Sequence, residues 1–93
     1  MIHFLVHDES DDVGVAVVDV TAGSDCAGRN LTTNQSVGTK AIEDIPLGHK
    51  LALKNFAAGD SVTKYGCVIG RVTQPIKMGQ HVHVHNLKTR RWA

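Results

Sequence analysis

The sequence predicts an all-β fold, in which short strands form a compact small barrel and residues 1–93 make a single domain. Three observations support this prediction. The apolar residues occur in short runs rich in valine and isoleucine, as in strands. No window carries the i, i+3, i+4, i+7 apolar stripe of an amphipathic helix, so we expect less than about one fifth of the residues to be helical. A turn-like pattern with a central glycine also recurs along the chain.

Strand signals occur in short segments that polar turns separate. The segments are 2–6, 13–20, 37–45, 50–53, 61–63, 68–72 and 81–87. Residues 23–35 are instead rich in Gly, Ser, Asp, Asn and Thr, which is the composition of a loop or an exposed hairpin. The run 8–12 is acidic and the tail 88–91 is basic, and we expect both to be solvated.

The glycine pattern has the form apolar, two residues, Gly, two residues, apolar. It is centred on Gly23, Gly48, Gly59 and Gly79. A glycine in such a setting suits a tight turn with a positive φ angle, flanked by apolar residues that pack as a strand begins. The spacing is irregular, which excludes a solenoid repeat. We therefore expect Gly48, Gly59 and Gly79 to be corners with positive φ.

Composition limits the classes of function. The chain has 93 residues, of which 42% are hydrophobic and 20% charged, and its formal net charge is +1. We expect no general binding to nucleic acid or to a membrane surface at this charge. No basic leader with a long apolar segment opens the sequence, and no apolar run approaches the ~20 residues that cross a bilayer. Cys26 and Cys67 lack CxxC spacing and fit a reducing compartment, so we expect a cytoplasmic protein.

The most informative stretch begins at His81, where three histidines alternate with valines. Alternate side chains of a strand share a face, so we expect His81, His83 and His85 on one face. Val82 and Val84 would then pack into the core. Such a histidine face could bind an anion, transfer protons or hold a metal, and a half-exposed strand without a role is the plain alternative. A metal is the weakest of these, because ligands along one straight strand close no tetrahedral shell unless another chain or a bend completes it.

Four further segments occur in a fixed order: DIPLGHKLAL at 44–53, KYG at 64–66, IG at 69–70 and HVHVHN at 81–86. Together they resemble the SAF domain of the altronate and galactarate dehydratase family. The resemblance extends from about residue 2 to the C-terminus. The beginning and the end of the chain look most like the alpha subunits of (2R)-sulfolactate sulfo-lyases, with the small subunits of altronate dehydratases second.

The resemblance implies a β-clip fold, as in type III antifreeze proteins, and a role as the small subunit of a lyase that eliminates sulfite or water from a hydroxylated acid. It also implies a large catalytic subunit as partner, a small anionic hydroxy acid as substrate, and iron (Fe²⁺) that the large subunit mainly holds. The isolated chain could form a homo-oligomer. A module that only grips a ligand or stabilises its partner is the competing class. We expect no lyase activity from the isolated chain, because one histidine strand cannot supply a base, an acid and an electrophile together.

The candidate site residues follow from the histidine stretch and from the resemblance. The catalytic candidates are His83 and His85, and the substrate-binding candidates are His81, Asn86, Lys64, Tyr65 and His49. No metal site is assigned to this chain alone, although His81, His83 and His85 could hold a metal together with a partner. We expect at least two of these three to face the partner's active site.

Alternatives stay open for the other candidates. Lys64 and Tyr65 precede a glycine and could approach an anionic substrate closely, or Tyr65 could cover one end of the barrel beside a solvated Lys64. Asn86 could orient a histidine, bind substrate or only form a turn. His49 follows a corner glycine and is a candidate through the resemblance. His3 and His7 flank the first strand without a companion motif, and we expect a structural role for both.

Overall fold

The computed structural model describes residues 1–89, and all of the regular structure within them is β. The strands are β1 (Phe4–Val6), β2 (Val13–Ala16), β3 (Asp25–Asn30), β4 (Ser36–Lys40), β5 (Lys50–Ala52), β6 (Ser61–Lys64), β7 (Cys67–Val72), β8 (His81–Val82) and β9 (Leu87–Thr89). The all-β prediction is therefore confirmed. The described residues include no helix long and apolar enough to cross a membrane.

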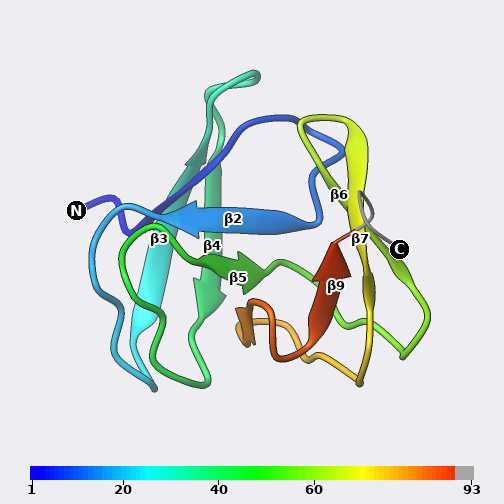
Figure 1. The fold of residues 1–93 in the computed structure, drawn as a ribbon. Coiled ribbons are helices and arrows are strands. Elements are labelled where there is room, and N and C mark those ends of the chain that lie inside the picture. The colour runs from blue at the N-terminus through cyan, green and yellow to red at the C-terminus, as the bar shows by residue number, and fades with distance from the viewer. Residues whose placement is uncertain (90–93) are drawn as a thin grey trace.

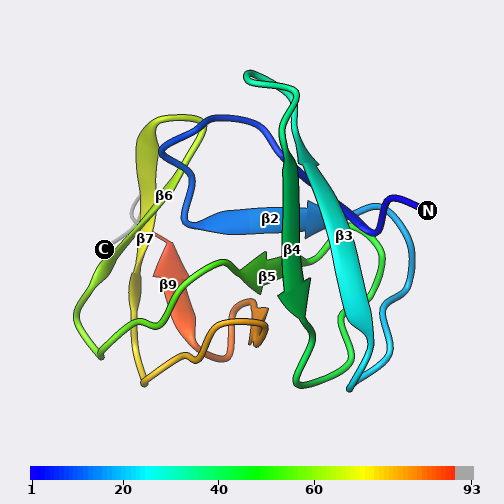
Figure 2. The same cartoon turned by 180° about the vertical axis from the view of Figure 1, so that it is seen from behind.

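The strands form two sheets, a larger one of six strands and a smaller one of three. One sheet has the order β4-β3-β1-β2-β5-β8 and the other the order β6-β7-β9. The pairing of β1 with β3 is parallel, whereas β2 with β5 and β5 with β8 are antiparallel. In Figures 1 and 2, β2 and β5 run across the middle, with β3 and β4 to one side and β6, β7 and β9 to the other. The short strand β8 therefore forms the edge of the larger sheet beside β5.

The buried apolar side chains form two clusters, and the central strands contribute to both. The first cluster consists of Phe4, Val6, Ala16, Val20, Cys26, Ala41, Ile45 and Leu51. The second consists of Val13, Ala52, Phe56, Val62, Val72, Ile76, Val82 and Leu87. Neighbouring residues of β5 enter different clusters, because Leu51 and Ala52 point to opposite faces of the strand. Strands β2 and β5 thus join two small cores into one fold.

Four tight corners with a central glycine connect the strands, as the sequence predicts. The φ angles of Gly23, Gly48, Gly59 and Gly79 are +87°, +86°, +94° and +86°. These values lie in the left-handed region, which glycine enters without a steric penalty, as at the third position of a type II turn. The prediction that Gly48, Gly59 and Gly79 are corners with positive φ is confirmed.

Each corner is closed by a backbone hydrogen bond and is joined to a second corner. The N–H that follows the glycine donates to the carbonyl three residues earlier, and at the Gly48 corner His49 donates to Pro46 at 2.9 Å. Two isolated antiparallel bridges, one before each pair of corners, join Val20 to Ile45 and Phe56 to Ile76. The recurrent sequence pattern therefore corresponds to a recurrent structural unit.

The polar segment 23–35 was predicted as a loop or an exposed hairpin, and the hairpin is confirmed, because residues 25–30 form β3 and pair with β4. Two predicted strands are too long, because β2 ends at Ala16 and not at residue 20, and β4 ends at Lys40 and not at residue 45. The single strand predicted for 81–87 is wrong, because β8 ends at Val82 and a turn follows before β9. Val84 lies in this turn with 76% of its surface exposed, whereas Val82 is fully buried. The predicted valine face therefore reaches the core through Val82 alone.

The basic tail is only partly described. Lys88 and Thr89 belong to β9, which pairs with β7, and both are exposed. Residues 90 and 91 of the predicted tail lie outside the described part of the chain.

Candidate functional site

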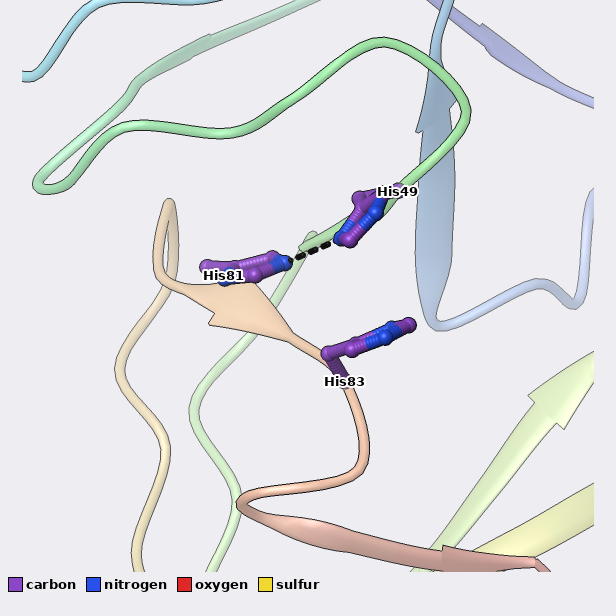
Figure 3. A group of neighbouring side chains, drawn as sticks. All are labelled: His49, His81 and His83. Carbon is purple, nitrogen blue, oxygen red and sulfur yellow. Dashed lines mark hydrogen bonds between the residues drawn. The ribbon is translucent and has the colours of Figure 1, made fainter.

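Four imidazoles gather where β5 and β8 pair. His49 Nδ1 and His81 Nε2 share a hydrogen bond of 2.8 Å. The ring centroid of His83 lies 4.2 Å from that of His49 and 5.6 Å from that of His81. The ring of His85 lies 5.2 Å from that of His81. Figure 3 shows His49 and His81 pointing toward each other from two chain segments, with the ring of His83 beside them.

The backbone brings these segments together through strand pairing. His49 directly follows the corner at Gly48 and leads into β5, and its carbonyl accepts a hydrogen bond from the N–H of Ala16 in β2. His81 opens β8 and lies opposite Leu51 of β5 in the antiparallel register. The two imidazoles are therefore neighbours across a sheet, although 32 positions separate them in the sequence.

The side chain of Asn86 holds the backbone of the turn that carries His83 and His85. Asn86 is fully buried, and its Nδ2 donates to the carbonyl of His81 at 2.8 Å. Its Oδ1 accepts a hydrogen bond of 3.0 Å from the N–H of His83. The carbonyl of His85 accepts a hydrogen bond from Gln74 Nε2 at 2.8 Å. These bonds hold the chain in a bend after β8.

The prediction that Asn86 binds substrate is not supported by this geometry. A substrate would have no access to a fully buried side chain whose amide oxygen and nitrogen are both bonded within the turn. The two hydrogen bonds fit the alternatives in which Asn86 orients a histidine or forms the turn.

Charge around the imidazoles favours their neutral form. Partial burial lowers the pKa of His81, and the nearby His49 and His85 lower it further. Partial burial also lowers the pKa of His83, with smaller contributions from His49 and Lys50. The cause is that a charged imidazole loses hydration and is repelled by neighbouring positive groups. His81 and His83 are thus available as proton acceptors or lone-pair donors near neutral pH.

Two residues of this site escaped the sequence reasoning. Lys50 follows His49 directly, and burial followed by the charge of Lys64 lowers the pKa of its amine. Glu43 accepts a hydrogen bond of 2.8 Å from the N–H of His81 through its Oε1. The position of Lys50 beside a candidate histidine is a signal that could have identified it. Nothing near Glu43 in the sequence indicates its contact with β8.

Lys64 and Tyr65 lie in the turn between β6 and β7, at some remove from the histidines. Tyr65 and Gly66 have φ angles of +55° and +71°, as in a two-residue hairpin turn. Lys64 Nζ lies 3.6 Å from the ring centroid of Tyr65, and the ring of His7 lies 4.3 Å from it. The charge of Lys64 lowers the pKa of Lys50, the residue after His49. Within residues 1–89, the ring of Tyr65 packs against His7 and against none of the clustered imidazoles.

The candidate side chains other than Asn86 are partly or fully exposed. A hollow of the described surface lies on the smaller sheet, lined by Ser61, Cys67, Val68, Gly70, Arg71, Lys88 and Thr89. None of the candidate residues lines this hollow. The histidine cluster therefore has the geometry of a half-site, which another surface would have to close before water is excluded.

The fold agrees with what sequence comparison finds. The sequence model of the altronate/galactarate dehydratase SAF domain matches residues 2–90, and the chain belongs to this family. It is 47% identical over 92 residues to the (2R)-sulfolactate sulfo-lyase subunit alpha of Chromohalobacter salexigens, and the match covers 98% of each chain. The corresponding subunit of Paracoccus pantotrophus is 49% identical over 59 residues, which are 63% of this chain and 88% of that one.

A second group of relatives is much longer. Altronate dehydratase of Bacillus subtilis is 38% identical over 86 residues, which are 92% of this chain and 16% of that protein. The chain is thus similar to whole sulfo-lyase alpha subunits and to one part of altronate dehydratase. The resemblance inferred from the sequence motifs is confirmed.

Proposed function

We propose that this chain is the small, alpha-type subunit of a lyase that eliminates sulfite from (2R)-sulfolactate. The observation that carries the proposal is the match over 98% of both chains, at 47% identity, to a protein named as such a subunit. The alternative is the small subunit of a sugar-acid dehydratase that eliminates water, which the 38% identity to an altronate dehydratase supports. A ligand-binding or stabilising module without chemistry of its own is the competing class.

The proposed reaction removes a proton beside a carboxylate and expels sulfite from the neighbouring carbon. It needs a base for the proton and positive groups that hold the anionic substrate. The depressed pKa values of His81 and His83 suit proton acceptance, and the amine of Lys50 suits anion binding. In this proposal His83 and His85 take part in proton transfer, while His49, His81 and Lys64 position the substrate.

A partner subunit completes the proposed site. The relatives are named as alpha subunits, and the side chains of the histidine cluster are partly or fully exposed, so we expect a large subunit to cover them. The family resemblance adds iron (Fe²⁺), held mainly by the large subunit, and a cytoplasmic location. Bound iron would polarise the substrate carboxylate. The isolated chain lacks a surface that covers the histidine cluster and the other groups that an elimination needs, so it should show no turnover.

The test is to purify the chain with its large subunit and to assay sulfite release from sulfolactate and water loss from altronate. His83→Gln and His85→Gln should each lower turnover of the complex about tenfold or more, which corresponds to about 1.4 kcal/mol in the barrier, without loss of assembly. The matched control is His3→Gln, because the His3 Nδ1 atom accepts a hydrogen bond from Ala27 beside β1, and β2 and β5 separate it from β8.

Three results would change the proposal. Turnover by the isolated chain would contradict the half-site. Water loss from altronate without sulfite release from sulfolactate would favour the dehydratase alternative. Full activity of a complex with His81, His83 and His85 all replaced would leave the module as the better description.

A further inference from the structure

The ring nitrogens of three half-buried histidines converge in this structure. One ligand nitrogen each from His49, His81 and His83 lies within 4.8 Å of the other two. A divalent metal holds imidazole nitrogens at about 2.0–2.1 Å, which places neighbouring ligand nitrogens roughly 3 Å apart. The nitrogens of His49 and His81 are already 2.8 Å apart. To share an ion with this pair, a nitrogen of His83 would have to move closer to both.

The bend after β8 makes this convergence possible. On a straight strand His83 would lie beside His81 and both rings would point the same way, as the alternation predicts. In the structure the chain leaves β8 at Val82, and the ring of His83 lies closer to His49, at 4.2 Å, than to His81, at 5.6 Å. The three rings therefore come from a corner, a strand and a turn, and their planes lie within 34° of one another.

The supporting shell holds the backbone of these histidines in place. Asn86 joins the carbonyl of His81 to the N–H of His83, and Glu43 accepts from the N–H of His81. His49 is held at the corner by its bonds to Pro46 and Ala16. Ligands on a fixed backbone lose little conformational entropy when a metal binds, which raises affinity.

The chemistry of the donors also suits a cation. A metal binds the lone pair of an unprotonated imidazole nitrogen, and in the hydrogen bond between His49 Nδ1 and His81 Nε2 one of the two nitrogens already acts as an acceptor. The Glu43 carboxylate brings a negative charge against β8, which partly offsets the positive charge of the nearby Lys50. Three nitrogen ligands suit Zn²⁺, Co²⁺ and Fe²⁺ and leave coordination positions for solvent or an anion.

We propose that His49, His81 and His83 form a three-imidazole site for a divalent transition metal within this chain. The proposal is independent of the lyase assignment, because it concerns binding of the metal alone. If the holoenzyme iron lies at the subunit interface, these histidines are this chain's share of its ligands. The plain alternative is a hydrogen-bonded pair of imidazoles with a third ring stacked on it.

The test is metal binding by the full chain, expressed without a histidine tag and stripped of metal with a chelator. Titration with Co²⁺ should show one bound ion by calorimetry, and the visible absorption spectrum of the bound Co²⁺ should report nitrogen ligands. His49→Gln, His81→Gln and His83→Gln should each weaken Co²⁺ binding at least tenfold. His3→Gln, which alters a histidine on the far side of β2, should leave it unchanged.

Two further variants separate this site from a second group of potential ligands, namely Glu43, His81 and His85. Glu43→Gln and His85→Gln should weaken binding less than His83→Gln does. The proposal is overturned if the wild-type chain binds no more Co²⁺ than the triple variant at 49, 81 and 83. It is also overturned if binding is lost in the 43 and 85 variants but kept in His83→Gln.

Circular dichroism of each variant controls for folding, and His83→Gln is the decisive one because the ring of His83 lies outside both core clusters. The outcomes also separate the two proposals. Co²⁺ binding by a chain whose complex is inactive on sulfolactate would support the metal site and refute the lyase assignment. Sulfite release by a complex whose alpha chain binds no Co²⁺ would support the lyase assignment and refute the metal site.

Discussion

The four glycine corners share one backbone geometry, yet only two of them lead into the candidate site. After Gly48 come His49 and Lys50, and after Gly79 comes His81 one residue further on. The corners at Gly23 and Gly59 lead into Ser24–Asp25 and Asp60–Ser61, which contact none of the imidazoles. The difference lies in the strands that follow. Those after Gly48 and Gly79, β5 and β8, pair with each other, whereas β3 pairs with β1 and β4, and β6 pairs with β7.

This comparison separates what a corner does from what strand pairing does. A corner with positive φ fixes where a strand starts and which face its first residues present. It supplies no chemistry. Two corners become a site when their strands pair, because the residues just after the glycines then become cross-strand neighbours. Substitutions at equivalent positions of the four corners should therefore differ in predictable ways.

The largest expected effect is on folding, at Gly79. A Cβ atom there would overlap the carbonyl of Lys40, whereas a Cβ at Gly48 or Gly59 would meet nothing within 4 Å. Gly79→Ala should lower the free energy of unfolding by about 3 kcal/mol, from the positive φ together with the clash. Urea unfolding of Gly79→Ala beside Gly59→Ala measures the difference. Equal losses in the two variants would show that the Lys40 carbonyl moves aside freely.

The next effect concerns two asparagines that both serve turns. Asn86 is fully buried and bonds within the histidine turn, whereas Asn55 is exposed and accepts from the N–H of Met78 at the Gly79 corner. Asn86→Ala leaves a partly buried donor and a partly buried acceptor without their partner and should cost about 2 kcal/mol, while Asn55→Ala should cost less than about 1 kcal/mol because water replaces the lost bond.

The readout for this pair is urea unfolding together with the Co²⁺ affinity of the folded variants. Asn86→Ala should also weaken Co²⁺ binding, because it releases the bend that turns His83 toward His49. Asn55→Ala should leave the affinity unchanged. A variant at 86 that binds Co²⁺ as well as the wild type would show that the bend does not depend on Asn86.

The corners and the strands between them could be predicted from the sequence, because both depend on local signals. Glycine with flanking apolar residues reports φ at one position, and β-branched runs report a strand. The hairpin arm β3 was missed as a definite strand because its residues are small and polar. The turn at 83–86 was missed because Val-His alternation favours a strand locally. The two hydrogen bonds of Asn86, which end that strand, depend on burial that no local pattern reports.

The candidate site was harder to predict than the strands, because it also depends on contacts that no local sequence pattern reports. The clustering of His81, His83 and His85 was expected from alternation, and the rings do lie close together, but the cause is a bend and not a shared strand face. His49 belongs to the cluster because β5 pairs with β8, which is a contact between distant parts of the chain. Motif order suggested His49, but only the pairing explains its position.

The smallest effect is the sharpest test of the comparison, because it uses two corners with the same surroundings. Gly48 and Gly59 have φ angles of +86° and +94°, and a Cβ at either would meet nothing within 4 Å. Ala at either position should therefore cost about 1 kcal/mol of unfolding free energy, from the positive φ alone. The stability loss should be the same within the error of urea unfolding.

The two variants should differ in the site and nowhere else. Gly48→Ala strains the residue before His49 and should shift that imidazole, so Co²⁺ binding should weaken several-fold. Gly59→Ala precedes Asp60 and β6, which hold none of the clustered histidines, so its Co²⁺ affinity should match the wild type. Equal affinity in both variants would mean that the imidazole of His49 is positioned by its contact with His81 and not by the corner, and strand pairing alone would then account for the site.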